Sequence, residues 1–294
     1  MDTPHTPQDE QAALWNGPAG QAWVALQDLL DGMFMPLERM LVEAIHGALG
    51  TRPAPQVLDV GCGTGSTTLA LARQLGPASR CVGIDLSAPM VALARQRAHS
   101  TAIPHTGAAH PARFIVADAQ RHVFEPARLD AIASRFGVMF FDDPVQAFTR
   151  LRQASRAGAA LRCLTWRSAT ENPFMTTAER VAAPLLPGLP ARQPGAPGQF
   201  AWADPARVRA ILTDSGWAEI ELEAVDVVCT LPEAGLLPYL SQMGPVGVAL
   251  QRADASTRAR AIDAIRPAFD PFVQDGEARY TAACWMVHAR APGA

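Results

Sequence analysis

The residues best suited to chemistry are an aspartate and three glycines that share one short stretch. Residues 57–65 read VLDVGCGTG, so an apolar run ends in Gly61, Gly63 and Gly65, and a helical pattern follows. Glycines let backbone approach a ligand closely, and the amides at a helix N-terminus favour a carboxylate or a phosphate. Asp59 would repel a phosphate but pair with an ammonium group. The stretch therefore predicts a ligand that carries both a carboxylate and an ammonium.

Two ligand classes use such a turn. The dinucleotide fingerprint needs a further glycine where this chain has Ser66, and it meets a pyrophosphate, which Asp59 disfavours. S-adenosylmethionine (SAM) has a carboxylate, an ammonium and no phosphate. The nonapeptide resembles motif I of the class I SAM-dependent methyltransferases. This resemblance implies that SAM is the cofactor and that its binding residues include Asp59, Gly61, Cys62, Gly63 and Gly65.

Two further aspartates end the next two predicted strands. Asp85 closes the strand at 80–85, at the distance from the glycines where α/β nucleotide sites place a carboxylate for two ribose hydroxyls. Asp118 ends the third strand, where a carboxylate can accept the amino protons of adenine. The three acids thus match, in chain order, the ammonium, ribose and adenine of SAM. We expect the adenine site to be completed by Leu86, Met90, Ala119 and Gln120.

The end of the fourth predicted strand faces the reacting centre, because this strand adjoins the first across the topological switch point. Residues 134–137 read SRFG. Methyltransferases that act on bases of DNA and RNA carry an Asn-Pro-Pro-aromatic run here, so the difference argues against a nucleic-acid substrate. We expect Ser134 and Arg135 to contact the methionine part of SAM, and Arg135 to pair with its carboxylate.

The resemblance also implies a fold. Strands and helices alternate along the chain, which indicates an α/β protein with a Rossmann-like sheet. In the family, the seven strands of the sheet follow the order 3-2-1-4-5-7-6, and strand 7 is antiparallel. Helices flank this sheet, and we expect a helical cap in addition. Within the family, the chain resembles the small-molecule methyltransferases of the ubiquinone and menaquinone type. Two N-terminal helices, expected near 21–31 and 36–49, would form a cover that brings Gln21 and Trp23 to the cofactor.

We divide the chain into a disordered tail, a helical cover, a SAM-binding core, loop and cap elements, and C-terminal edge strands with a helical insertion. Their respective bounds are 1–12, 13–50, 51–166, 167–216 and 217–294, with the insertion at 231–275. The apolar face of the insertion is expected to close a substrate pocket or, less readily, to form a dimer interface. The predicted pocket residues are Trp15, Phe136, Met139, Trp166, Asn172, Phe174, Tyr239 and Met243.

Composition excludes several kinds of chemistry. All 25 basic residues are arginines, so lysine Schiff-base chemistry is impossible. The net charge of −3 does not indicate the positively charged surface that nucleic-acid binding requires. The five cysteines are far apart, as expected of reduced, buried thiols. His99, His105 and His110 share a predicted loop without an acid or a cysteine to complete a metal site, so no metal is expected. With no signal peptide and no membrane-spanning run, we expect a cytoplasmic protein.

These patterns predict a SAM-dependent methyltransferase that transfers the sulfonium methyl to an O, N or C acceptor. The acceptor is expected to be a small, largely apolar molecule, and the rate to come mainly from orientation and desolvation. No side chain is assigned as a general base. A non-catalytic SAM-binding sensor and an NAD-dependent oxidoreductase remain alternatives. We expect a monomer or homodimer that binds neither nucleic acid nor a membrane.

Overall fold

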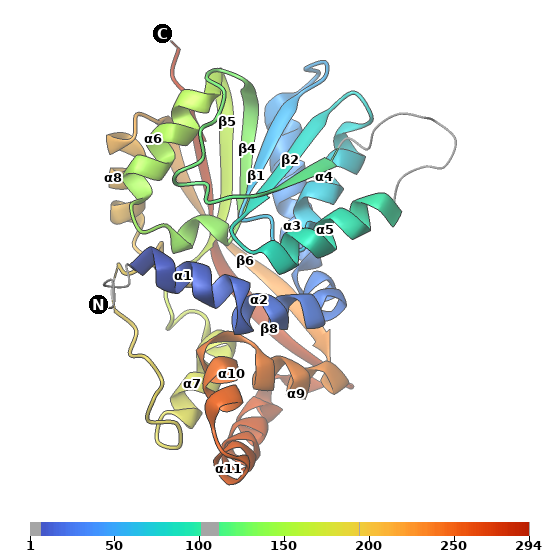
Figure 1. Ribbon diagram of the computed structural model, residues 1–294, viewed down its shortest axis with the longest axis vertical. Helices are drawn as coiled ribbons and strands as arrows, with labels where there is room; N and C mark the ends of the chain where they lie inside the picture. The colour runs from blue at the N-terminus through green and yellow to red at the C-terminus, as the bar shows by residue number, and fades with distance from the viewer. Residues whose placement is uncertain (1–6, 101–111, 194, 294) are drawn as a thin grey trace, which may run out of the picture.

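The computed structural model describes residues 7–100, 112–193 and 195–293. One mixed sheet carries helices on both faces, and α7, α9, α10 and α11 gather at one end of the molecule (Figure 1). The strands are β1 (Gln56–Val60), β2 (Arg80–Asp85), β3 (Ala112–Val116), β4 (Leu129–Arg135), β5 (Ser155–Trp166), β6 (Ala218–Pro232), β7 (Val273–Gln274) and β8 (Glu277–Arg290). The helices are α1 (Pro7–Asn16), α2 (Pro18–Ala25), α3 (Gln27–Leu49), α4 (Ser66–Leu75), α5 (Ala88–Ser100), α6 (Pro144–Ala154), α7 (Pro173–Ala182), α8 (Pro205–Asp214), α9 (Glu233–Gln242), α10 (Gly244–Arg252) and α11 (Ala255–Ile265), with 3₁₀ turns η1 (Gly137–Phe140) and η2 (Arg266–Phe272).

The sheet follows the order β3-β2-β1-β4-β5-β8-β6, and the short β7 pairs with β8. Strands β1 to β5 pair in parallel, whereas β8 runs antiparallel to both β5 and β6. The predicted order 3-2-1-4-5-7-6 is confirmed, because β8 is the predicted seventh strand and β7 is one short addition. Right-handed crossovers leave β1 and β4 in opposite directions, so α4 and α5 cover one face and α6 and α8 the other.

The burial of the strands reflects their positions in the sheet. β4 is buried at all five of its inner positions, as expected of a strand covered by helices on both faces. β6 lies at the edge and alternates near its end, with Val227 and Cys229 buried and Asp226 and Val228 exposed. Helix α3 packs against α4, β4, β5 and β6, and thereby covers the centre of one face.

The N-terminal region differs from the prediction in two places. Residues 7–12 were expected in a disordered tail, but they belong to α1, which Pro7 can begin because the first amides of a helix have no intrahelical partner. The helices expected at 21–31 and 36–49 are instead α2 and one continuous α3 that passes through Pro36. Pro36 removes a helical hydrogen bond, but Met33 and Leu37, both fully buried, hold this turn against the sheet. Residues 1–6 of the tail, and His105 and His110, lie outside the described residues.

Helices α7, α9, α10 and α11 form a cap beyond the carboxyl ends of the parallel strands (Figure 1). α10 contacts α2 and α7, and α11 contacts α7, α9 and α10. The cap thus combines the segment before β6 with the insertion between β6 and β8. No helix in the described part of the chain has both the length and the apolarity needed to cross a bilayer.

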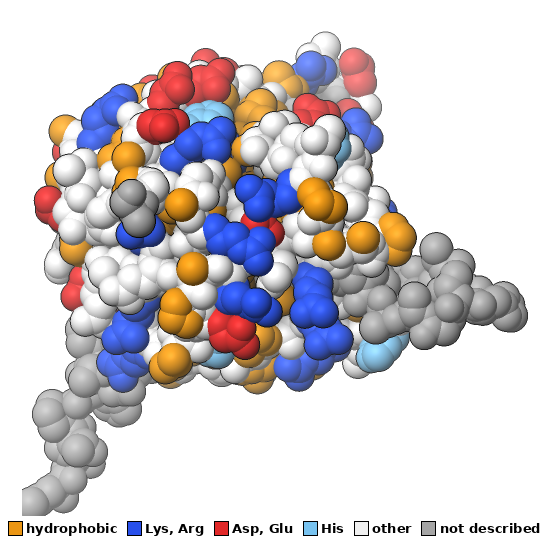
Figure 2. All heavy atoms as spheres, turned by 90° about the horizontal axis from the view of Figure 1, so that it is seen from above, with side chains coloured by type: hydrophobic (Ala, Val, Ile, Leu, Met, Phe, Trp, Pro, Cys, Tyr) orange, Lys and Arg blue, Asp and Glu red, His pale blue; other side chains and the backbone are white. Residues whose placement is uncertain are grey.

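The opposite end of the sheet carries many arginines with acids among them (Figure 2). The start of β4 lies at this end, where the buried Asp130 pairs with Arg52 at 2.9 Å and with Arg156 at 2.7 Å. This network joins the starts of β1, β4 and β5. It positions the strands whose other ends form the cleft described next.

Candidate cofactor site

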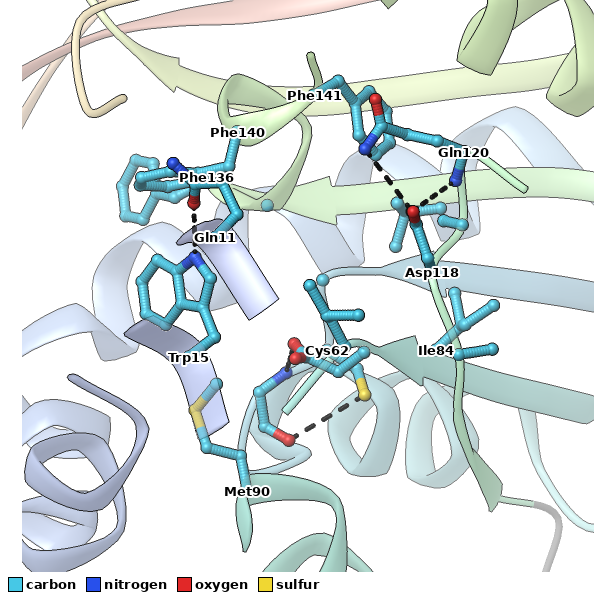
Figure 3. Close-up of a pocket in the computed structure, with 18 of the residues that line it drawn as sticks. Gln11, Trp15, Cys62, Ile84, Met90, Asp118, Gln120, Phe136, Phe140 and Phe141 are labelled. Carbon is cyan, nitrogen blue, oxygen red and sulfur yellow. Dashed lines mark hydrogen bonds between the residues drawn. The ribbon is translucent and has the colours of Figure 1, made fainter. Parts of the chain in front are cut away.

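A cleft lies at the carboxyl ends of β1, β2 and β4, beneath α1 (Figure 3). It encloses about 1000 Å³, including space open to solvent. Of the residues predicted to bind SAM or substrate, those that line it are Trp15, Trp23, Gly61, Cys62, Gly63, Asp85, Leu86, Met90, Asp118, Ala119, Gln120, Arg135 and Phe136. The predicted residues outside the lining are Gln21, Asp59, Gly65, Ser134, Met139, Trp166, Asn172, Phe174, Tyr239 and Met243.

The glycine-rich turn is shaped by contacts within the protein. Gly61 has a φ of +71°, and a Cβ there would stand 2.5 Å from Cα of Gly137. The end of β1 and the segment after β4 can therefore lie this close together only because both positions are glycines. The amides of Gly61 and Cys62 donate to the carbonyl of Ile84, at 2.9 and 3.2 Å. The amide of Gly63 donates to Asp85 at 2.8 Å, and that of Gly65 to the carbonyl of Cys62 at 2.9 Å. These four amides are therefore already bonded within the protein, and the expectation that the amides at the start of α4 favour a carboxylate stays a prediction.

Asp85 is held in a fixed orientation at the cleft. Its Oδ2 accepts from the Gly63 amide and its Oδ1 from the Ser87 amide, each at 2.8 Å. Burial raises the pKa of this carboxyl, while the backbone amides oppose the shift. Each oxygen keeps acceptor capacity for a ribose hydroxyl. Ribose binding by Asp85 stays a prediction, and its geometry suits it.

Asp59 lies behind the turn and is only 1% exposed. Its Oδ2 accepts a hydrogen bond from the hydroxyl of Thr68 at 2.6 Å. Burial raises its pKa to about 6, although the Thr68 hydrogen bond and the charge of Arg135 act in the opposite direction. The carboxylate does not line the cleft, so its pairing with the ammonium of SAM stays a prediction.

Asp118 and Gln120 border the other end of the cleft (Figure 3). The backbone amide of Gln120 donates to Asp118 Oδ1 at 2.9 Å. The side-chain oxygen of Gln120 accepts from the amides of Asp142 and Asp143, at 2.8 and 3.1 Å. Gln120 therefore ties the loop after β3 to the loop before α6. Adenine binding by Asp118 stays a prediction.

Aromatic side chains form the wall facing these acids. Trp15 meets Phe140 edge to face at 5.0 Å between ring centroids, and its Nε1 donates to Gln11 at 3.0 Å. Phe136 has a φ of +70°, a strained conformation for a bulky residue, and stacks on Trp166 at 4.6 Å. Trp166 thus supports the wall from beneath. Residues of the lining that the sequence analysis missed include Gln11, Thr64, Phe140 and Phe141.

Several predicted substrate residues serve the interior of the cap and sheet instead. Both side-chain atoms of Asn172 bond to the backbone of Ala283, each at 3.0 Å. Phe174 stacks on Tyr280 at 4.1 Å, and the hydroxyl of Tyr239 donates to the sulfur of Met175 at 3.4 Å. Ser134 is likewise used internally, donating to the carbonyl of Val60 at 2.7 Å. The structure does not bring these residues to the cleft.

The cleft fits an adenosyl amino acid. It offers an oriented carboxylate at the end of β2, a second carboxylate at the end of β3, and an arginine at the end of β4. It lies at the switch point of a doubly wound sheet, which is where such folds bind nucleotides. The fold and the cleft therefore define a nucleotide-binding α/β protein of the Rossmann-like class.

Comparison with known proteins narrows this class. Residues 57–158 match the family described as a methyltransferase domain. The demethylmenaquinone methyltransferase of Lactiplantibacillus plantarum is 33% identical over 108 residues, which span 37% of this chain and 44% of that protein. That of Renibacterium salmoninarum is 24% identical over 220 residues, spanning 72% of this chain and 85% of that protein.

Solved structures show the same fold. The YcgJ protein of Bacillus subtilis aligns with a TM-score of 0.55 at 15% identity, covering 87% of this chain and all of that one. A phosphoethanolamine N-methyltransferase of Haemonchus contortus in complex with SAM aligns with a TM-score of 0.53 at 16% identity, covering 99% of this chain and 58% of that one. Residues 57–158 are thus similar to a methyltransferase domain, and the chain shares the fold of these solved structures.

Proposed function

We propose that this protein transfers the sulfonium methyl group of SAM to an O, N or C atom of a small, largely apolar molecule. The observation that carries the proposal is the aromatic wall of the cleft, formed by Trp15, Trp23, Phe136, Phe140 and Phe141. Such a wall favours an apolar acceptor and keeps water from the reacting atoms. Aromatic faces also stabilise a cation, by about 0.5–2 kcal/mol.

The cleft supplies orientation rather than proton transfer. The ionisable side chains that line it, among the described residues, are Cys62, Asp85, Asp118 and Arg135. Burial raises the pKa of the Cys62 thiol well above its usual range, and both aspartates accept hydrogen bonds from backbone amides. SAM brings an electrophilic methyl group. We therefore propose an acceptor that is nucleophilic without an enzymatic base, such as a phenolate, enolate, thiolate or amine.

Reduced quinones are the first acceptors to test. The curated relatives are named for demethylmenaquinone, whose reduced ring is apolar and bears acidic hydroxyls. Because the match to the first of these spans less than half of its length, the test should include acceptors of other kinds. The charge of −3 and the absence of the Asn-Pro-Pro-aromatic run support a small molecule over nucleic acid.

The test is a turnover assay with a panel of acceptors. Protein and SAM are incubated with reduced quinones, phenols, thiols and amines, and mass spectrometry follows S-adenosylhomocysteine and the methylated product. We expect turnover with at least one apolar acceptor and strong loss of it in Phe140→Ala, which removes part of the aromatic wall. Tight SAM binding without turnover on the whole panel would instead identify a sensor.

A further inference from the structure

The aromatic wall of the cleft contains an amide side chain whose orientation is fixed by the protein. Gln11 lies on α1, one turn before Trp15, and both residues line the cleft. The indole Nε1 of Trp15 donates a hydrogen bond to Oε1 of Gln11 at 3.0 Å (Figure 3). An indole nitrogen can only donate. The oxygen of the Gln11 amide therefore faces Trp15, and the amide nitrogen points away from it.

The amide nitrogen of Gln11 is left for a ligand. Its N–H groups have no hydrogen-bond acceptor among the described residues, and the side chain is partly buried in the lining of the cleft. A ligand that fills the cleft removes water from these N–H groups. The cost of that lost hydration is recovered only if the ligand accepts a hydrogen bond. We therefore expect the ligand to present an acceptor atom to Nε2 of Gln11.

The position of Gln11 separates it from the residues expected to hold the adenosyl part of SAM. Asp85 and Asp118 lie at or just beyond the ends of strands, whereas Gln11 is carried by the helix on the other side of the cleft. Trp15, its hydrogen-bond partner, packs edge to face on Phe140 at 5.0 Å between ring centroids. Gln11 thus belongs to the aromatic wall, against which the proposed acceptor lies.

Contacts with the turn after β2 keep this amide in place. The hydroxyl of Ser87 donates to the backbone carbonyl of Trp15 at 2.6 Å, and Phe140 supports the indole ring. The backbone and the side chain of Trp15 are therefore both held, and Trp15 in turn holds the amide of Gln11. A donor that is oriented before the ligand arrives loses little conformational freedom on binding, so its hydrogen bond contributes more to affinity.

The chemistry of the donor selects among the acceptors that the cleft could take. A phenolate or enolate oxygen has several lone pairs, so it can accept a hydrogen bond from Gln11 while the molecule still attacks the methyl group. A neutral amine has a single lone pair, which methylation itself requires, and sulfur is a weak hydrogen-bond acceptor. We propose that Nε2 of Gln11 donates to a phenolate or enolate oxygen of the acceptor, and that Trp15 orients it for this contact. The inference rests on the proposed function and narrows the acceptor to an oxyanion.

The test uses two probes of nearly the same shape. 4-Nitrophenol, at a pH where it is ionised, and neutral 4-nitroaniline are titrated into the protein saturated with S-adenosylhomocysteine, and absorbance reports their binding. Gln11→Met keeps the volume of the side chain and removes the donor. We expect 4-nitrophenolate to bind about 10- to 100-fold more weakly to this variant than to wild type, as the loss of a hydrogen bond to a charged group implies. 4-Nitroaniline should bind both proteins within about threefold.

The ionisation of the bound probe gives a signature that a purely structural role would not produce. A donor at the oxygen stabilises the anion, so the apparent pKa of bound 4-nitrophenol should be lower by about 1 in wild type than in Gln11→Met. Gln11→Glu keeps an oxygen for Trp15 but places a negative charge near the probe, so this pKa should rise further. Gln153→Glu makes the same change at an exposed position of α6, outside the cleft, and should titrate as wild type does.

Three outcomes would overturn the inference. The first is a wild-type complex that does not bind 4-nitrophenolate. The second is equal binding and equal ionisation of the probe in wild type, Gln11→Met and Gln11→Glu. The third is a loss of S-adenosylhomocysteine affinity in Gln11→Met as large as the loss for the probe, which would assign the amide to the cofactor. A wild-type protein that does not bind S-adenosylhomocysteine would instead contradict the proposed function itself.

Discussion

A single buried carboxylate should make the stability of the protein depend on pH. Burial raises the pKa of Asp59 from 3.8 to about 6, so the folded state favours the neutral acid. The resulting stabilisation is complete below pH 4 and is lost as the pH rises through 6. Replacing Asp59 by Asn should remove this loss. Between pH 3.5 and 7.5, the unfolding free energy of Asp59→Asn should gain about 3 kcal/mol relative to wild type.

Denaturant unfolding of both proteins without cofactor measures this difference. Thr68 remains in the variant and can still bond to the amide, so the packing is preserved. Parallel pH profiles of the two proteins would show that Asp59 does not titrate in this window.

Gly137 provides a second test at the residue scale. A Cβ there would stand 2.5 Å from the carbonyl oxygen of Val60 and 2.6 Å from Cα of Gly61, and neither backbone atom can move independently of its strand. Gly137→Ala should therefore destabilise the protein by about 1–3 kcal/mol in urea unfolding. Gly47→Ala is the control, because a Cβ on this residue of α3 meets nothing within 4 Å. It should be neutral or stabilising, by up to about 1 kcal/mol.

The sequence located these residues better than it predicted their contacts. The apolar runs place Asp85 and Asp118 at strand ends, and the structure brings both to the cleft. The same reasoning applied to Asp59, but its side chain points to Thr68, nine positions later in the next helix. Likewise, the motif indicates a glycine at 61, whereas the close approach of Gly137 is a long-range contact that no local pattern contains.

At the scale of elements, α1 is fastened to the turn that carries Asp85. Ser87 donates to the carbonyl of Trp15 at 2.6 Å. Asn16 donates to the carbonyl of Leu86 at 3.2 Å and accepts from the amide of Ala88 at 2.9 Å. These bonds hold Gln11 and Trp15 over the cleft.

Asn16→Ala removes two of these bonds and should loosen α1. We expect S-adenosylhomocysteine to bind roughly 3- to 10-fold more weakly, mainly through faster dissociation, as the loss of one or two net hydrogen bonds implies. Stopped-flow or surface plasmon resonance measures the rate. Asn16→Asp keeps the acceptor for Ala88 and should fall between the two proteins. An unchanged dissociation rate in Asn16→Ala would mean that α1 does not retain the cofactor.

Helices and strands were predictable from the sequence where their burial produces a clear pattern of apolar residues. The bounds of β2 are those expected from its sequence, because an inner strand reads as one short apolar run. The N-terminal helices were not, because Pro36 indicates a helix start yet lies inside α3, where tertiary packing outweighs the local preference. The cap shows a further limit. Phe174 and Tyr239 read as apolar pocket residues, but they pack on Tyr280 and on each other, and periodicity does not distinguish a pocket wall from a core.

At the scale of the whole molecule, the cleft joins three parts that are distant in sequence. α1 supplies Gln11 and Trp15, the ends of β1 and β2 supply the turn and Asp85, and the end of β4 supplies Arg135. A ligand that contacts all three should stabilise the folded state as a unit, because it binds only when they are assembled. The shift in melting temperature then reports how completely the cleft recognises a ligand.

S-adenosylhomocysteine at 100 times its Kd should add about 2.7 kcal/mol to the unfolding free energy. For a chain of this size, that corresponds to a rise in Tm of roughly 5–10 °C. NAD⁺ at the same concentration should cause no shift, because its pyrophosphate would have to pack against the glycine-rich turn, where the amides of Gly61, Cys62, Gly63 and Gly65 already donate within the protein. Asp85→Ala should lose most of the shift, measured against its own Tm without ligand, since it removes the carboxylate expected at the ribose. Asp263→Ala, on the exposed side of α11, is the matched control and should respond as wild type does. A comparable shift with NAD⁺, or an undiminished one in Asp85→Ala, would contradict the assignment of the cleft to an adenosyl amino acid.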